Sequence, residues 1–436
     1  MTRPETLTPA AASKARRPAG LARLWVSEAF GSVGLQITLF VVPLVAVTVF
    51  DATALQIGAL NSLESVAAIA FGLVTGLVID RLGGSRAVAL ANVVRAVAAV
   101  TLLVGLLYWD GLWFLFVACV LIGVGSLAND AGVSTAVLEL SSSRPRDLNR
   151  TNALLRVTTV ASEVSGPGLG GLLVLSFGLA AASGAAAAAF GLAAGLLLVS
   201  IVLPMRQREP FGDIGRRGVD TAASGIEAGA GRFLSGGRFI WRHATLRPLV
   251  ISSLHFNFFS AMVQSVFVIY CLHDLHFTTG DLAIVGVSGG AGGLIGGFIA
   301  SSTAVAQRSR AVYLVALSLP GLCVWALLME RSAPHTTQVI GVMAAMGLWS
   351  AAMVVCLVLF NTVRQLQSPA HLVGRIASTE RTLALGGELP GALLGGLLGT
   401  LISPTPALVL GAAGMMTAAL WIARVPKGEA WTTTPD

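Results

Sequence analysis

Apolar residues fill this chain in stretches of about 20, and such a stretch is long enough for a helix to cross the hydrocarbon core of a bilayer. None of the stretches resembles a set of strands. The pattern predicts an all-α polytopic membrane protein with twelve transmembrane helices. The predicted spans are 25–49, 55–79, 87–108, 112–138, 152–175, 179–203, 248–272, 282–305, 311–329, 337–361, 376–401 and 405–423.

The longest polar interruption separates two sets of six predicted helices. We therefore expect a cytoplasmic tail over 1–24, a six-helix bundle over 25–204, a cytoplasmic linker over 205–246, a second bundle over 247–424 and a cytoplasmic tail over 425–436. Two such halves are typical of a transporter that rocks around a central site.

The end of the linker reads GRFLSGGRFIWRH, residues 231–243, in which arginines alternate with apolar and aromatic residues. This pattern favours a short helix lying on the cytoplasmic surface of the membrane. A solvated linker is the alternative, because basic linkers are common.

Composition and charge exclude two other classes of protein. Hydrophobic residues make up 55% of the chain and charged residues 11%, whereas soluble domains contain about a quarter charged residues. The net charge of +7 could indicate nucleic-acid binding, but 24 of the 28 basic residues lie in the tails and in the turns after even-numbered spans. That distribution follows the positive-inside rule and predicts that both termini are cytoplasmic, in a multi-pass protein of the cell (inner) membrane. The N-terminal tail also lacks the pattern of a cleaved signal peptide.

The two halves are related by a duplication. Adding 225 to the number of a residue in or just before the fifth span gives a matching residue in or just before the eleventh. The matched pairs are Arg150 and Arg375, Arg156 and Arg381, Glu163 and Glu388, Gly166 and Gly391, Gly170 and Gly395, and Gly171 and Gly396.

The loop after the second span carries a spaced motif. It contains a glycine, an Asp-Arg pair, a second glycine and a basic residue, at Gly76, Asp80, Arg81, Gly83 and Arg86. The motif resembles the cytoplasmic loop signature of the major facilitator superfamily, except that Gly84-Ser85 stands where a second basic residue is common. The resemblance implies a loop that latches the two halves together, and we expect Asp80 to contact Arg381 or the start of the eleventh helix. Ordinary loop charge is the alternative.

A second motif lies in the fifth span, in the sequence SEVSGPGLGG. It resembles the antiporter signature of the same superfamily, which is associated with exporters. Serine replaces the usual first glycine. Proline in a helix removes a backbone hydrogen bond, and glycines admit a close neighbour, so the motif indicates helix packing and gating. Its residues are Ser162, Gly166, Pro167, Gly170 and Gly171.

Glu163 is an addition to that motif, roughly 16 Å into the fifth helix at 1.5 Å per residue. A carboxylate near the bilayer middle is costly unless it is paired or faces water. Two interpretations remain open: Glu163 and Glu388 carry protons, or they form structural ion pairs with Arg156 and Arg381.

Other acidic residues compete for proton coupling, and polar stripes indicate a cavity. Glu64 in the second span and Asp130 in the fourth are further proton-site candidates. Polar residues at helical spacing share one face of the first span and one face of the seventh. In the superfamily these two helices line the central path, so the stripes are candidate substrate contacts. They comprise Glu28, Ser32 and Gln36, and Ser253, Asn257, Ser260 and Gln264.

The resemblance covers residues 24–424 and is nearest to bacterial drug and siderophore exporters of the enterobactin-exporter and macrolide-efflux type. It implies the major facilitator fold, with two pseudo-symmetric six-helix bundles. We expect a proton-coupled exporter, an antiporter, that moves a small amphipathic compound such as an antibiotic, secondary metabolite or siderophore by alternating access. An importer and a non-transporting receptor or regulator are the alternatives. We expect a monomer in the bilayer, with a small-molecule substrate and protons as partners and without enzymatic activity, cofactor, metal or nucleic acid.

Overall fold

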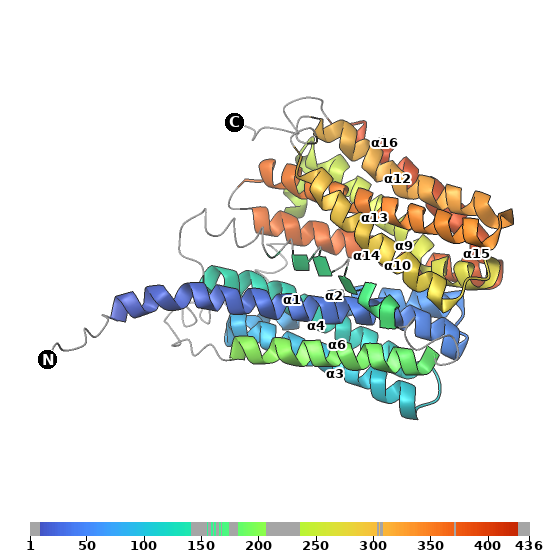
Figure 1. The fold of residues 1–436 in the computed structure, drawn as a ribbon. Helices are drawn as coiled ribbons and strands as arrows, with labels where there is room; N and C mark the ends of the chain where they lie inside the picture. The colour runs from blue at the N-terminus through green and yellow to red at the C-terminus, as the bar shows by residue number, and fades with distance from the viewer. Residues whose placement is uncertain are drawn as a thin grey trace.

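The computed structural model of the chain describes residues 9–140, 182–205, 236–302, 308–369 and 372–425, together with residue 305 and scattered positions between 155 and 173. All of its long elements are helices (Figure 1). They are α1 (Pro9–Phe50), α2 (Ala54–Leu82), α3 (Gly84–Tyr108), α4 (Trp113–Leu140), α6 (Ala182–Met205), α9 (Leu246–Ile269), α10 (Thr279–Ala300), α12 (Ser309–Met329), α13 (His335–Leu366), α14 (Val373–Leu401), α15 (Pro404–Thr417) and α16 (Ala419–Ile422).

The predicted helices correspond to these elements. Eleven of the twelve spans fall on them, with α15 and α16 together forming the last, and the described positions of the fifth span, between 155 and 173, are also helical. Among the described residues, nine helices are long and apolar enough to cross a membrane, by length and composition. The predicted all-α polytopic architecture is confirmed.

The structure differs most from the sequence prediction at the start of α1 and within the last span. α1 begins at Pro9 instead of residue 25, because the run after Pro9 is rich in alanine, the strongest helix former. The last span is interrupted at Ala418. There the hydroxyl of Ser252 on α9 donates a 2.9 Å hydrogen bond to the Ala418 carbonyl, and this bond competes with the regular helical pattern.

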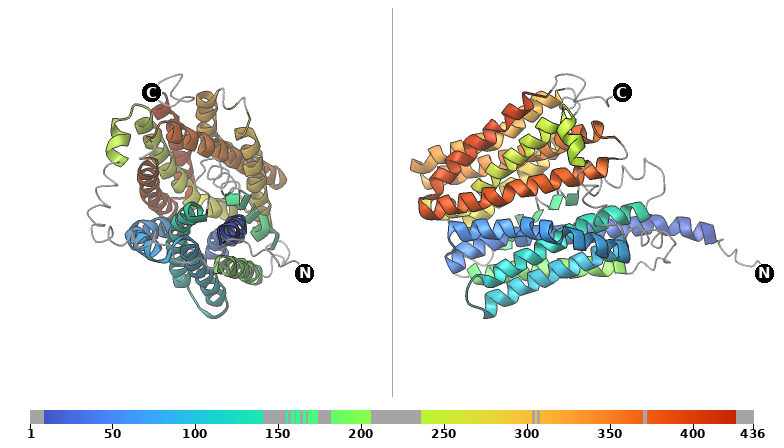
Figure 2. Two further views of the ribbon diagram at one scale, coloured as in Figure 1. Left: turned by 90° about the vertical axis from the view of Figure 1, so that its left-hand side faces the viewer. Right: turned by 180° about the vertical axis from the view of Figure 1, so that it is seen from behind.

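The chain forms two bundles. The N-terminal bundle contains α1 to α6 and the positions described between 155 and 173, and the C-terminal bundle contains α9 to α16 (Figure 1). The start of α1 and the end of α16 lie at the same end of the molecule, which we call the termini end; the opposite end is the far end. The bundles converge toward the far end and diverge toward the termini end (Figures 1 and 2).

The packing of the two bundles follows the duplication. α3 packs against α4 and α6, and α1 packs against α6. In the C-terminal bundle, α12 packs against α13 and α15 in the same way, and α9 packs against α15. By these contacts α1, α3, α4 and α6 have the counterparts α9, α12, α13 and α15, in the same order along the chain.

At the far end the bundles meet directly through α2 and α14. The amide of Leu55 donates a 2.9 Å hydrogen bond to Oγ1 of Thr400. Ser62, further along α2, is 3.4 Å from the carbonyl oxygen of Leu389. This contact joins the two bundles along the far half of both helices.

Candidate functional site

A buried polar cluster lies inside the N-terminal bundle, between α1, α3 and α4. Nδ2 of Asn129 donates to both carboxylate oxygens of Glu28, at 3.0 Å each, and the hydroxyl of Ser32 donates to the same carboxylate at 3.2 Å. Arg95, only 4% exposed, lies beside Asn92 with 3.5 Å between Nη1 and Oδ1. Its guanidinium acts electrostatically on Glu28. The candidate cavity residues Glu28 and Ser32 are thus brought together and are held by neutral donors.

A second polar cluster lies in the C-terminal bundle, between α9, α13 and α14. Nη1 of Arg364 and Oε2 of Glu380 are 3.0 Å apart, and both side chains are nearly buried. Ser253 donates to Glu380 at 3.5 Å, and Asn257 donates to Ser253 at 3.3 Å. The candidates Ser253 and Asn257 therefore belong to this network. Gln264 forms a separate contact further along α9, donating to Ser260 at 3.1 Å.

An ion pair joins the two bundles in the half nearer the termini end. Nη2 of Arg381 on α14 is 2.7 Å from Oδ2 of Asp130 on α4. Asp130 follows Asn129 of the first cluster, and Arg381 follows Glu380 of the second. The pair consequently connects the two polar clusters into one series that crosses between the bundles.

The structure gives Arg381 a partner other than the two that the sequence favoured. Glu388 lies two turns further along α14 and accepts a 3.2 Å hydrogen bond from Ser65 on α2. Glu388 thus takes part in the contact between α14 and α2, whereas Arg381 takes part in the contact between α14 and α4. The side chain of Asp80, the other expected partner, lies outside those that the structure describes.

The glycines of the antiporter-type motif lie at close helix contacts. A Cβ atom on Gly166 would overlap Gln36 of α1, and one on Gly170 would meet Phe40 of α1 at 3.1 Å. A Cβ atom on Gly171 would be 2.8 Å from the carbonyl oxygen of Ala283, on α10 of the other bundle. The hydroxyl of Ser162, where the signature has glycine, bonds to its own helix at the Thr158 carbonyl, 2.8 Å away.

The duplicated glycines occupy equivalent contacts in the second half. Gly391 and Gly395 approach the backbone of α9, the counterpart of α1, within their own bundle. A Cβ atom on Gly396 would be 2.5 Å from the carbonyl oxygen of Ala54, on α2 of the N-terminal bundle. Gly171 and Gly396 are matched by the duplication, so the same glycine of each half admits a helix of the opposite half.

The loop motif lies at the junction of α2 and α3. Gly83 has a φ of 78° and allows the sharp turn between the two helices, because left-handed backbone is accessible to glycine without strain. Gly84 begins α3 against the backbone of Ala136 on α4. Arg86 is exposed. Gly76, Asp80 and Arg81 lie in the last turns of α2, within a segment whose side chains the structure does not describe.

Several candidates lie outside the described residues or side chains. Arg156, Glu163 and Pro167 are among the positions that the structure does not describe, and Glu64 is placed in α2 without a described side chain. The proton-carrier and ion-pair interpretations of Glu163 therefore stay hypotheses.

Sequence reasoning missed four residues of the polar series. Asn129, Arg95, Glu380 and Arg364 were not singled out, although two of them carried a signal. Asn129 and Glu380 directly precede the chosen candidates Asp130 and Arg381. Adjacent polar residues within an apolar helix point about 100° apart and can serve two different neighbours.

The profile of the Major Facilitator Superfamily matches residues 24–387. Among curated protein sequences, none matches this chain.

Solved structures share the fold. A bacterial homologue of the iron transporter ferroportin in the inward-facing state has 16% sequence identity and a TM-score of 0.68, with 94% of this chain and 99% of that chain covered. A bacterial metal transporter also has 16% identity, with a TM-score of 0.62 and the same coverage. A peptide transporter solved with alafosfalin has 15% identity and a TM-score of 0.65, with 94% and 96% covered. This chain belongs to the Major Facilitator Superfamily and is a membrane transporter with that fold.

Proposed function

We propose that the protein is a proton-coupled exporter of a small amphipathic compound, such as an antibiotic, secondary metabolite or siderophore. The positive-inside distribution of arginines supports a cytoplasmic termini end, in a protein of the cell (inner) membrane. Each chain contains both bundles and the contacts between them, so we expect a monomer to be the functional unit.

The Asp130–Arg381 ion pair is the observation that carries this proposal. It joins α4 to α14 at 2.7 Å, yet 46% of the Asp130 side chain and 57% of the Arg381 side chain are exposed. A half-exposed carboxylate is within reach of protons from water. Protonation of Asp130 would remove the negative charge and thereby loosen the bundles at the cytoplasmic end.

This chemistry gives the order of events that an antiporter needs. Deprotonated Asp130 holds Arg381, as in this structure, where the bundles diverge toward the termini end (Figure 1), and further approach of the bundles from this contact would close the cytoplasmic end around the substrate. Protonated Asp130 releases Arg381 and favours separation of α4 from α14. A proton thus travels inward on the return step, because the two bundles change their contact when the charge changes.

The far end supports the same scheme. Backbone contacts at Gly171 and Gly396 bring the bundles together there in this structure. Neither of these two contacts includes a charged side chain, so closure at the two glycines depends on shape. A transporter that alternates between a charge-controlled contact at one end and a shape-controlled contact at the other has separate gates for its two states. The Gly-Pro signature, which resembles that of exporters, favours outward movement.

Glu28 favours substrates that carry a positive charge. Its carboxylate is 8% exposed and its described hydrogen bonds come from the amide of Asn129 and the hydroxyl of Ser32. Neutral donors leave the negative charge only partly compensated, although Arg95 lies nearby. A cationic group on an apolar molecule would add to that compensation.

The test is accumulation of a panel of dyes and antibiotics in an efflux-deficient bacterial host that expresses the full chain, with and without a protonophore. We expect lower accumulation of at least one amphipathic cation, restored by the protonophore. Asp130→Asn is expected to weaken this effect, and Asp274→Asn is its matched control, because Asp274 pairs with Arg331 at 2.9 Å within the C-terminal bundle at the far end. Higher accumulation than in the empty host would indicate import and would contradict the proposal.

The direction of proton movement is measured in inverted membrane vesicles with a pH-sensitive dye. Addition of an exported compound should release protons from the acidified interior in vesicles with the native chain. Substrate movement without proton release would leave the exporter intact but would reject proton coupling.

A further inference from the structure

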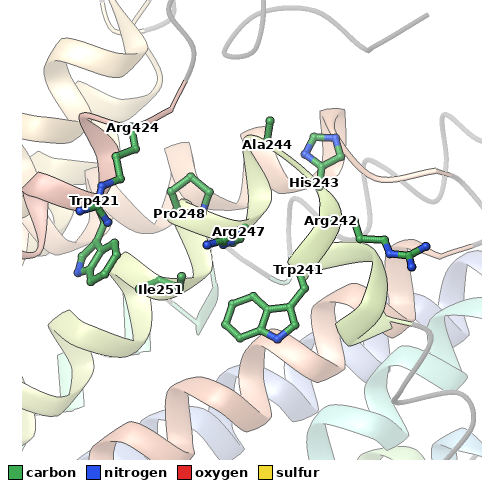
Figure 3. Close-up of a pocket in the computed structure, with 9 residues that line it drawn as sticks. All are labelled: Trp241, Arg242, His243, Ala244, Arg247, Pro248, Ile251, Trp421 and Arg424. Atoms are coloured by element: carbon green, nitrogen blue, oxygen red, sulfur yellow. The ribbon is translucent and has the colours of Figure 1, made fainter.

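A pocket of about 200 Å³ lies at the termini end, away from the contact between the bundles. Its walls come from three segments: the helical residues 236–242 of the linker, the start of α9 and the α16 region (Figure 3). The linker helix, in yellow-green, lies at the outer rim of the C-terminal bundle in the left view of Figure 2. The pocket is lined by Trp241, Arg242, His243, Ala244, Arg247, Pro248, Ile251, Trp421 and Arg424.

The polar lining of this pocket is cationic. Arg242, Arg247 and Arg424 contribute three guanidinium groups, and within the described part of the chain no carboxylate forms an ion pair with any of them. Arg242 extends away from Arg247 and Arg424 in Figure 3, so Arg247 and Arg424 are the central pair. Guanidinium groups bind phosphate oxygens through paired hydrogen bonds.

His243 shapes the pocket without adding charge at neutral pH. Its Nδ1 accepts hydrogen bonds from the backbone amides of Thr245 and Leu246, at 3.2 Å each. Burial lowers the pKa of His243 below its usual value, so the ring is largely neutral at pH 7. It caps the turn that leads into α9, while the arginines supply the positive charge.

Two tryptophans give the pocket an interfacial character. The indole rings of Trp241 and Trp421 lie on either side of Arg247 and Ile251 in Figure 3. The guanidinium of Arg424 lies 4.5 Å from the centre of the Trp421 ring. Tryptophan prefers the depth of the lipid headgroups, because its ring is amphipathic. The pocket thus combines phosphate-binding cations with residues suited to the membrane surface.

A partly apolar hollow adjoins the pocket. A second hollow, of about 360 Å³, is lined by Trp241, Arg247 and Ile251, all shared with the first. Trp241 is 57% exposed and Ile251 lies in the first turns of α9. A phosphate held at Arg247 would therefore have an apolar wall beside it, on which an acyl chain can lie.

We propose that this pocket binds the phosphate headgroup of an acidic phospholipid in the leaflet at the termini end. Basic pockets between transmembrane helices on the cytoplasmic side of a membrane bind the phosphate headgroups of acidic lipids. The linker helix continues into α9 through residues 243–245, whereas the α16 region meets both only through tertiary contacts, so a bound lipid would hold the α16 region against the linker helix and α9. The inference concerns the membrane environment of the protein and is independent of the direction of transport.

The test is binding of dioleoylphosphatidylglycerol to the purified, delipidated full chain, measured by native mass spectrometry. Dioleoylphosphatidylcholine is the probe without net charge, and glycerol 3-phosphate is the soluble probe. Arg247→Gln/Arg424→Gln removes the central pair, and Arg308→Gln is the matched control, because Arg308 is an exposed arginine at the same end that does not line the pocket. We expect the first phosphatidylglycerol to bind about tenfold more weakly in the double variant and unchanged in the control.

Three results would overturn the proposal. The first is equal affinity for both phospholipids, and the second is a loss of phosphatidylglycerol binding in Arg308→Gln equal to that in the double variant. The third is displacement of the bound lipid by millimolar glycerol 3-phosphate, which would assign the pocket to a soluble phosphate compound. If the double variant aggregates, the single variants Arg247→Gln and Arg424→Gln replace it, because both side chains are exposed. Each is then expected to weaken phosphatidylglycerol binding by about threefold or more, and an unchanged affinity in both would reject the site.

Discussion

Asp130 on α4 and Arg381 on α14 are separated by more than half of the length of the chain, yet their side chains meet at 2.7 Å. Each stands next to a residue of a polar cluster inside its own bundle, Asn129 beside Glu28 and Glu380 beside Arg364. The ion pair therefore links the interiors of the two bundles, in addition to the contacts between α2 and α14 toward the far end. Charge at one position can influence the relative arrangement of both halves.

The first prediction concerns this ion pair. Asp130→Asn is expected to reduce proton-driven transport by about tenfold or more, because the variant has no charge to lose on protonation. The same substitution should change the free energy of unfolding by less than about 1 kcal/mol, since half-exposed ion pairs contribute little to stability. Transport is measured in proteoliposomes with an imposed pH gradient, and stability by thermal unfolding.

The charge-swapped variant Asp130→Arg/Arg381→Asp is the control for the pair. It retains opposite charges at the contact, so we expect it to recover part of the activity lost in Asp130→Arg alone. If the swap recovers nothing while Asp130→Asn and Arg381→Gln both transport normally, the pair has no role in coupling.

The second prediction concerns closure of the far end. Gly396→Ala places a methyl group 2.5 Å from the carbonyl oxygen of Ala54, and backbone cannot yield as a flexible side chain does. We expect the bundles to separate there and the far-end closed state to be less populated. The reporter is Ala283→Cys, fully buried against Gly171 in the other interbundle contact, labelled with a membrane-impermeant maleimide.

Gly386→Ala is the matched control on the same helix, because a Cβ atom at Gly386 has no neighbour within 4 Å. Labelling of Ala283→Cys should rise severalfold with Gly396→Ala and stay unchanged with Gly386→Ala. Equal labelling in all three proteins would show that close approach at Gly396 does not control closure.

The third prediction concerns substrate charge. Glu28→Gln is nearly isosteric but removes the negative charge. It also replaces one of the two carboxylate oxygens that accept hydrogen bonds from Nδ2 of Asn129 with an NH2 group, which is a donor. For a cationic substrate of the panel we expect KM to rise about tenfold, and for a neutral one to change less than twofold. Ser32→Ala, which removes a single 3.2 Å hydrogen bond to the same carboxylate, is the milder comparison. Equal losses for cationic and neutral compounds would make Glu28 a structural residue.

The fourth prediction concerns stability of the C-terminal bundle. Arg364→Gln leaves Glu380 without its buried cationic partner and should destabilise the protein by about 3 kcal/mol. Arg364→Gln/Glu380→Gln should be closer to the native stability, because no uncompensated charge remains. Arg331→Gln, which breaks an ion pair whose arginine is 56% exposed, should cost less than about 1 kcal/mol. Thermal unfolding in detergent compares the stability of the three variants. A double variant no more stable than Arg364→Gln would refute the explanation.

The sequence predicted much of the fold because its signals are local or repeated. The length of each apolar stretch sets the length of a helix in a membrane, so eleven spans could be placed to within a few residues except at the start of α1. The 225-residue repeat identified Gly171 and Gly396 as equivalent, and the structure places both at contacts with the opposite bundle. Small residues carry such contacts in membranes because backbones must approach closely.

The pairing of charges is different, because it depends on how each helix is rotated and on which helix faces it. From the sequence, Arg381 had two plausible partners, Glu388 on its own helix and Asp80 in a distant loop. The structure pairs it with Asp130, and it places Glu388 beside Ser65. Helix length and duplication are properties of the chain taken alone. The partner of a buried or half-buried charge is set by rotation and tilt of whole helices, which only the packed bundles fix.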